Sequence, residues 1–104
     1  MKTIISSSGN SMKSEFDLRF GRAAWFCLYD EESKKTEFFE NEYKDAAQGA
    51  GGKVVEMVVG LGVNKAISGD FGPKAKDLLE RFKIQMVILP DEGQTIQDII
   101  NKLN

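Results

Sequence analysis

Short apolar runs with alternating side chains make up the first half of the chain. Residues 2–6 (KTIIS), 23–30 (AAWFCLYD) and 36–41 (TEFFEN) combine β-branched and aromatic residues and are bounded by polar turn residues, a pattern that predicts strands. In the second run both alternating sets are apolar, so we expect both faces of that strand to be buried. The short charged turn DEESKK joins the second and third runs, which indicates an antiparallel meander.

In the second half the apolar residues recur with the helical period of 3.6. Helices are predicted over residues 51–62, 73–83 and 95–104. Gly62 is suited to end the first helix, and Pro73 to open the second. Thr95 with Asp98 three residues later predicts an N-cap for the third. Two short apolar runs, 65–69 and 84–89, are predicted as strands between these helices.

The predicted order is β-β-β-α-β-α-β-α within a single domain, residues 1–104. Right-handed crossovers make the first, fourth and fifth strands parallel neighbours. The result is an α/β fold with a five-stranded mixed sheet in the order 3-2-1-4-5 and helices on its faces. This is the layout of a ribonuclease H-like fold.

Composition narrows the class of protein. The 104 residues are 41% apolar and 29% charged, as in a soluble globular domain, and the net charge is 14 − 16 = −2. This balance gives no support to nucleic-acid or membrane-surface binding, and no apolar run reaches the roughly 20 residues of a membrane span. The N-terminus lacks the features of a secretory signal. A single cysteine, Cys27, excludes an internal disulfide and indicates a reducing compartment, so we expect a cytoplasmic protein.

The absence of histidine restricts the chemistry. With no histidine and one cysteine the chain cannot build a tetrahedral zinc site, a histidine-dependent nucleophilic site or its own iron–sulfur site. A metal held by this chain alone would need oxygen ligands or would share Cys27 with an outside ligand. Because Cys27 lies in mid-strand among aromatic residues, an inert buried thiol is the simpler interpretation.

Four loops are expected to meet at one edge of the sheet. The predicted chain direction places four loops at the carboxyl edge of the parallel strands: residues 7–22, 41–51, 69–72 and 90–93. Open α/β sheets bind ligands at this edge. These loops also carry most of the glycines.

Each loop feature has two interpretations. Arg19 and Arg22 in DLRFGRA (17–23) could clamp an anion, or could brace the loop by pairing with nearby carboxylates (Glu15, Asp17 and Asp70). QGAGG (48–52) could offer backbone N–H groups to an anion, although a tight turn is the simpler interpretation. In SGDFGPKA (68–75), Asp70 or Gly72 could cap a helix. Phe20 is either a core anchor of its loop, which we favour, or a ring that stacks on a ligand.

An enzyme of the ribonuclease H type is not favoured. Such nucleases need carboxylates that converge on metal ions over the centre of the sheet. Asp17, Asp70 and Asp91 lie in loops, and the strands KTIIS and KAIS offer no inward acid. An oxygen-ligated metal phosphohydrolase therefore ranks last among the hypotheses, and we expect no catalytic residues.

Three segments resemble the dinitrogenase iron-molybdenum cofactor biosynthesis family. They are SSSGNSMKSEFDLRFGRAAWFCLYD, QGAGGKVVEMVVGLGVNKAISGDFGPKA and TIQDIINKLN, which together cover nearly the whole chain. The resemblance implies a ribonuclease H-like fold and a binding protein that carries or accepts iron–sulfur–molybdenum cofactor precursors during nitrogenase assembly, without catalysis. Cofactor-assembly proteins are the partners it implies, with neither nucleic acid nor membrane.

The resemblance also points to a cofactor-facing set of loop residues. With the neighbouring loop positions, the candidate cofactor-binding residues are Asn10, Arg19, Phe20, Gly21, Arg22, Gly49, Gly51, Gly69, Asp70 and Gly72. Family members often carry histidine before the glycines at 49 and 51, where this chain reads YKDAAQGAG. The metal ligands are therefore unknown, and an iron–sulfur(–molybdenum) cluster precursor would depend on arginines and backbone amides. The alternative is a protein-interaction or regulatory module that has lost metal binding.

Overall fold

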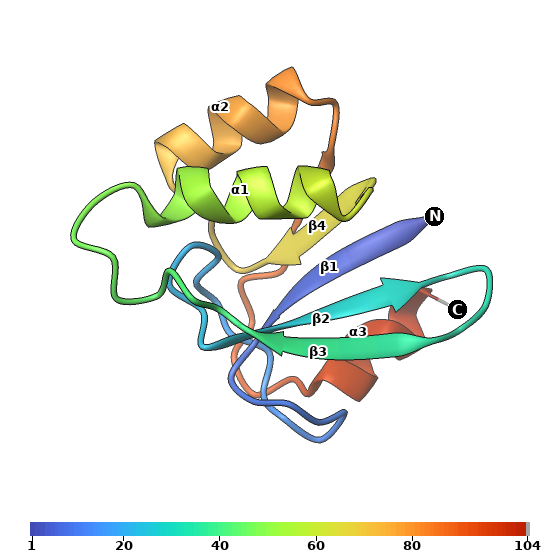
Figure 1. The fold of residues 1–104 in the computed structure, drawn as a ribbon. Coiled ribbons are helices and arrows are strands. Elements are labelled where there is room, and N and C mark those ends of the chain that lie inside the picture. The colour runs from blue at the N-terminus through green and yellow to red at the C-terminus, as the bar shows by residue number, and fades with distance from the viewer. Residues whose placement is uncertain (104) are drawn as a thin grey trace.

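A five-stranded sheet with helices on both faces forms the molecule, as the computed structural model of residues 1–103 shows (Figure 1). The elements in chain order are β1 (Lys2–Ser7), β2 (Trp25–Asp30), β3 (Thr36–Glu40), α1 (Ala50–Gly60), β4 (Lys65–Ser68), α2 (Pro73–Arg81), β5 (Gln85–Ile88) and α3 (Ile96–Leu103). This β-β-β-α-β-α-β-α order confirms the prediction.

The strand order is β3-β2-β1-β4-β5, as the connectivity predicts for a ribonuclease H-like fold. β1, β2 and β3 form the antiparallel meander, and β4 and β5 continue the sheet in parallel with β1. β1 is the central strand, and Ile4 lies between Leu28 of β2 and Ala66 of β4. The carboxyl ends of β1, β4 and β5 therefore lie at one edge of the sheet.

Two hydrophobic cores lie on opposite faces of the sheet, because successive strand residues point to opposite sides. α1 and α2 cover the face that carries Ile4, and α3 covers the face that carries Ile5. Both isoleucines are fully buried, as is Cys27, which lies in the α3 core. We expected both faces of the strand at 23–30 to be buried. This is confirmed at Phe26, which lies in the core under α1 and α2, and at Cys27, which lies in the core under α3.

The helix boundaries follow the local signals in the sequence. The predicted helix 51–62 runs from Ala50 to Gly60, with Leu61 as its C-cap, and Gly62 follows with a left-handed backbone (φ 74°). Pro73 is the first residue of α2, as predicted. The predicted helix 73–83 is shorter and ends at Arg81, because Lys83 turns into the left-handed region (φ 59°). The last residue of the predicted helix 95–104, Asn104, lies outside the described residues.

The two ends of the sheet differ in what they carry. The loops after β1, β4 and β5 lie at one end, whereas the chain starts at the other end and α3 runs back toward it (Figure 1).

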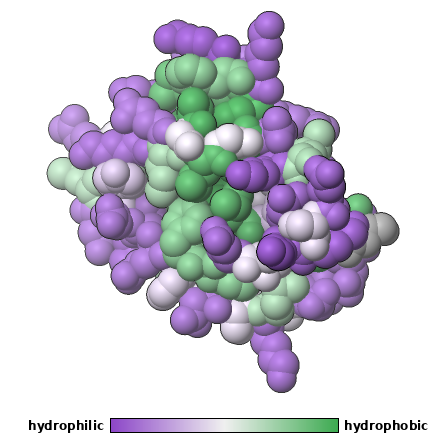
Figure 2. All heavy atoms as spheres, turned by 45° about the vertical axis from the view of Figure 1, so that its right-hand side comes forward, coloured by the Kyte–Doolittle hydropathy of each residue, from purple (hydrophilic) through white to green (hydrophobic). Residues whose placement is uncertain are grey.

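Figure 2 shows a band of apolar surface on one face, flanked by polar side chains. Within residues 1–103, no helix has the length and apolar character needed to cross a bilayer.

Candidate functional site

A pocket of about 390 Å³ lies where three loops meet at the carboxyl edge of the sheet. Its walls come from the turn after Asp17, the start of α1 and the start of α2. The lining residues are Arg19, Phe20, Gly21, Arg22, Gly49, Ala50, Gly51, Gly52, Asp70, Gly72, Pro73, Lys74 and Ala75. Its volume lies within the usual range of small-molecule sites.

Two buried serines hold the start of the first wall, the turn after Asp17, in place. The Ser6 hydroxyl at the end of β1 donates to the carbonyl oxygen of Asp17 at 2.6 Å and lies 2.8 Å from the hydroxyl of Ser68 in β4. The backbone of Arg19 then pairs in parallel with that of Asp70. The turn is thus tied to the ends of two neighbouring strands, beside the loop that leads into α2.

Phe20 anchors the same turn in the core. Its side chain is 2% exposed, and its ring centroid lies 4.9 Å from that of Phe71 and 5.7 Å from that of Phe26. The edge-on contact with Phe26 is a favourable aromatic geometry. The ring therefore belongs to the core beneath the pocket, which is the role we favoured for it.

Glycines allow the walls to approach more closely than side chains would permit. A Cβ at Gly21 would come within 2.9 Å of the Gly51 nitrogen, and a Cβ at Gly51 within 3.2 Å of the Ala75 Cβ. Gly49, directly before α1, has a left-handed backbone (φ 73°) that favours glycine. The turn, α1 and α2 are in van der Waals contact through residues with little or no side chain.

Both helices that reach the pocket start with unsatisfied backbone donors. Neither α1 nor α2 has a side-chain cap, and their first intrahelical bonds are Lys53 N–H to Gly49 O and Lys76 N–H to Gly72 O. The earlier N–H groups find no acceptor within residues 1–103: they belong to Ala50, Gly51, Gly52, Lys74 and Ala75. All five residues that carry these donors, at the N-termini of two helices, line one pocket.

α3 shows that this chain can satisfy a helix start where the structure requires it. Ile96 and Gln97 N–H donate to the Ser14 and Met12 carbonyls, at 3.0 Å each. Thr95 and Asp98 form the predicted capping box, with bonds of 3.1 and 3.0 Å. The open starts of α1 and α2 are therefore a local feature of the pocket.

The charges around the pocket favour an anion. Arg19, Arg22 and Lys74 line it with one carboxylate, Asp70. Lys74 lies in the first turn of α2, where the helix dipole disfavours a cation, and neither α1 nor α2 has an acidic residue in its first turn. The described residues supply no ion pair to Lys74.

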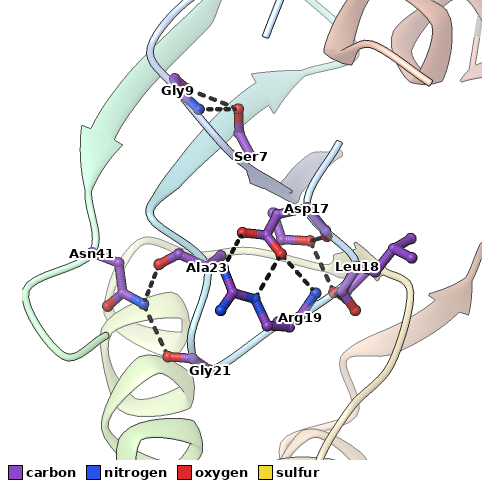
Figure 3. A network of polar contacts seen from close by, with 10 residues as sticks. Ser7, Gly9, Asp17, Leu18, Arg19, Gly21, Ala23 and Asn41 are labelled. Atoms are coloured by element: carbon purple, nitrogen blue, oxygen red, sulfur yellow. Dashed lines mark hydrogen bonds and ion pairs between the residues drawn. The ribbon is translucent and has the colours of Figure 1, made fainter. Parts of the chain in front are cut away.

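The two arginines also have partners inside the chain. Arg19 Nε and Nη2 each lie 3.2 Å from a carboxylate oxygen of Asp17, which accepts the Arg19 backbone N–H as well (Figure 3). The hydrogen bond to Asp17 and its negative charge raise the pKa of Arg19, so the guanidinium stays charged. Arg22 donates to the carbonyls of Lys44 and Ala46. Arg19 thus braces its loop through a carboxylate, as one of the two interpretations expected, whereas Arg22 braces its loop through carbonyl groups instead. Both arginines also line the pocket.

Eight of the ten candidate residues line the pocket, and two do not. Asn10 lies in the 8–14 loop, outside the pocket lining. Gly69 packs under the turn, where a Cβ would come within 2.8 Å of the Leu18 Cα. The 90–93 loop borders a separate groove through Glu92 and Gly93 and does not reach this pocket. Three loops, rather than the expected four, form its walls.

Two residues, Lys74 in the pocket lining and Asn41 beside it, do not stand among the candidates from the sequence. Lys74 carried a signal, since a lysine in the first turn of a helix opposes the helix dipole. Asn41 carried none, because its role depends on a loop 20 residues earlier: its side chain donates to the carbonyls of Gly21 and Ala23 (Figure 3).

Direct metal ligation by the chain has no support in the described residues, which hold no group of three or more His, Cys, Asp or Glu side chains placed to bind an ion. Cys27 is buried in the opposite core, and burial raises the pKa of its thiol to about 12. The donors of the pocket are N–H groups and cations, which suit the outer atoms of an anion.

Known proteins are similar to this chain in sequence and fold. Residues 1–104 match the family described as dinitrogenase iron-molybdenum cofactor. The apo form of the orange protein from Desulfovibrio gigas is 25% identical with a TM-score of 0.90, over 98% of this chain and 85% of that chain. A Thermotoga protein described as a candidate NifB is 33% identical with a TM-score of 0.84, over the same shares. No curated protein matches the sequence. The match over the full length, on a fold shared with these two structures, shows that the chain belongs to the dinitrogenase iron-molybdenum cofactor family.

Proposed function

We propose that the protein is a non-catalytic carrier that holds an anionic metal–sulfur cofactor, or a precursor of one, in the pocket between α1 and α2. One observation carries the proposal: five residues whose backbone N–H groups have no acceptor within residues 1–103 line the same pocket. Helix N-termini of this kind bind anions through the N–H groups and the positive end of the helix dipole. Arg19, Arg22 and Lys74 add positive charge at its walls.

The donor set restricts the form of the cargo. The chain has no histidine, and its one cysteine is buried away from the pocket. The cargo therefore arrives with its metal ions already coordinated, and the protein contacts its outer sulfide or oxide atoms. An iron–sulfur(–molybdenum) cluster precursor fits this description, and the family description points to the same class. Backbone donors bind such an anion without exchanging its ligands, which is what a carrier requires.

The setting and the partners follow from this role. A metal–sulfur cargo is stable in a reducing compartment, which agrees with a chain that has one buried cysteine and no disulfide. On this proposal the protein acts in the cytoplasm, where cofactor-assembly proteins would load and unload the pocket.

Anaerobic titration with tetrathiomolybdate, a sulfur-coordinated molybdenum dianion, tests the proposal. We expect saturable binding by the wild type, visible in the absorption of the anion, and weaker binding by the Arg19→Ala/Arg22→Ala variant. Arg81→Ala is the matched control, because Arg81 lies in the last turn of α2 and pairs only with Asp77 among the described residues. Equal binding by the wild type and the double variant, or no binding by the wild type, contradicts the carrier role.

A protein-interaction module is the second candidate function. It is favoured by one observation: both arginines already have partners in the chain, Arg19 in Asp17 and Arg22 in two carbonyl groups. Arginines that only brace loops would shape a surface for a partner instead of an anion. A wild type that binds no tetrathiomolybdate, but captures a cellular protein that the double variant does not, would support this function over the carrier.

A further inference from the structure

Two loops at the pocket hold each other through hydrogen bonds in both directions. From the side of β3, the Asn41 Nδ2 donates to the carbonyl oxygens of Gly21 at 2.9 Å and Ala23 at 2.8 Å. From the other side, Arg22 donates to the carbonyl oxygens of Lys44 and Ala46. Figure 3 shows the Asn41 side chain pointing onto the turn that carries Gly21 and Ala23.

Asn41 uses its polar groups fully. Its side chain is buried, with the residue 2% exposed, and its Oδ1 accepts the Tyr43 backbone N–H at 2.9 Å. Its own backbone N–H donates to Ala24 O at 3.0 Å. A buried amide in this position is sharply oriented, because each of its groups would be left unsatisfied by a rotation or a shift.

The turn that Asn41 holds is the wall of the pocket that must be placed most accurately. Gly21 lies against the backbone of Gly51 in the first turn of α1, and Arg22 follows it directly. A shift of residues 21–23 therefore moves the Arg22 guanidinium and uncovers or blocks the N–H groups of α1. Preorganised donors bind more tightly than donors that must be ordered on binding.

We infer that Asn41 is a positioning residue of the pocket: it does not touch the cargo, but sets the place of Gly21 and Arg22 against the start of α1. The affinity part of this inference rests on the proposed carrier function. The structural part does not, and the two are measured separately.

Asn41→Asp is the sharpest test. Aspartate has the same shape and keeps the acceptor for Tyr43, but it replaces the amide donor with an oxygen that faces the carbonyls of Gly21 and Ala23. Asn64→Asp is the matched control. Asn64 accepts the Lys2 backbone N–H through Oδ1 at the far end of the sheet, so this change keeps its bond and adds the same charge.

The first measurement needs no ligand. In ¹H–¹⁵N spectra we expect the two Asn41 side-chain protons of the wild type to exchange slowly with water, since both are bonded in a buried site. Asn41→Asp should displace or broaden the amide signals of Gly21, Arg22 and Gly51, and Asn64→Asp should leave them unchanged. Rapid exchange in the wild type, or unchanged signals in the Asn41 variant, overturns the inference. Should the aspartate variant not fold, Asn41→Ala removes the same donors without a charge, and the wild-type exchange measurement decides by itself.

The second measurement is the affinity for tetrathiomolybdate at a temperature where circular dichroism shows each variant to be folded. We expect about tenfold weaker binding for Asn41→Asp and less than about twofold change for Asn64→Asp, as for loss of preorganisation at a small-ligand site. Undiminished binding by a folded Asn41→Asp overturns the positioning role. If the wild type binds no tetrathiomolybdate but Asn41→Asp still displaces the signals of Gly21, Arg22 and Gly51, the carrier function is rejected. Asn41 then remains the residue that positions the turn.

Discussion

Gly21 lies against the first turn of α1 so closely that a Cβ at Gly21 would come within 2.9 Å of the Gly51 nitrogen. The contact is between two backbones, so neither side can move away as a flexible side chain would. It fixes the turn that carries the arginines relative to the unsatisfied N–H groups of α1. The size of the pocket thus depends on a residue that has no side chain.

Gly21→Ala is expected to destabilise the fold by about 1–3 kcal/mol, because the new methyl group must push α1 and the turn apart. Gly60→Ala is the matched control. Gly60 ends α1, a Cβ there would meet no atom of another residue within 4 Å, and alanine should stabilise the helix by about 0.5–1 kcal/mol. Urea unfolding of the two variants should give shifts of opposite sign. A neutral Gly21→Ala would contradict the close contact.

Lys74→Gln should weaken tetrathiomolybdate binding while it stabilises the fold. Removing one cation from a solvent-accessible site lowers the affinity for a dianion by about threefold to tenfold. The same change relieves an unfavourable charge at the start of α2 and adds a few tenths of a kcal/mol to the free energy of unfolding, on the order of a helix-dipole effect.

Lys76→Gln controls for the net charge in this experiment. Lys76 lies in the same turn of α2 but does not line the pocket. Its substitution should leave the affinity close to that of the wild type. Equal losses for Lys74 and Lys76 would indicate a general electrostatic effect in place of a contact in the pocket.

Cys27 should be unreactive in the folded protein. Burial raises the pKa of its thiol from 9.0 to about 12, so the nucleophilic thiolate is scarce at about pH 8. Mass spectrometry after iodoacetamide treatment should show no alkylation under native conditions and full alkylation in concentrated guanidinium. Modification of the native protein at the rate of the unfolded one would place the thiol at the surface.

The same thiol should make stability depend on alkaline pH. The pKa of the Cys27 thiol is higher in the folded state than in the unfolded state. Its contribution to the free energy of unfolding is therefore complete below pH 9.0 and is lost as the pH rises toward about 12. Over this range the free energy of unfolding should fall by up to about 1.4 kcal/mol per pH unit from this group. The difference between the wild type and Cys27→Ala isolates it from lysines and tyrosines.

The start of α3 should depend on its capping box. Thr95→Ala removes the acceptor of the Asp98 N–H and is expected to cost about 1 kcal/mol in urea unfolding. The hydrogen bonds from the Thr95 backbone and side chain lower the pKa of Asp98. The contribution of the Asp98 carboxylate to the free energy of unfolding is therefore present above pH 3.8, its ordinary pKa, and is lost as the pH falls below that value. Asp98→Asn should flatten this acid-side loss, and an unchanged acid profile would contradict the box.

Much of this fold could be read from local signals. Gly62, Pro73 and the Thr95–Asp98 pair each act within one turn of chain, so the sequence around them indicates where helices start or stop, although α1 ends at Gly60 and not at Gly62. The strand order followed from the chirality of crossovers. The predicted bounds of two strands, 23–30 and 84–89, were less accurate than the helix signals, since β2 is Trp25–Asp30 and β5 is Gln85–Ile88. The end of a strand depends on where pairing with its neighbour stops, which local sequence does not encode.

The position of the pocket was predictable in outline, and its internal contacts were not. The carboxyl edge of the sheet followed from topology, which brought Arg22, Gly51 and Gly72 to one pocket. The partners of Arg22 and the role of Asn41 are contacts between loops that lie about 20 residues apart in sequence, and no periodicity encodes them. The displacement of the 90–93 loop to a neighbouring groove likewise depends on how residues 14–16 pack beside α3.

The opposite placement of the pocket and the chain start has a practical consequence. β1 begins at the end of the sheet away from the loops that follow β1 and β4, and α3 runs back toward that end (Figure 1). A linker joined at either end would therefore lie away from the pocket that these loops line. The protein could therefore be anchored to a sensor surface, or fused to another protein, with its opening directed at the solution.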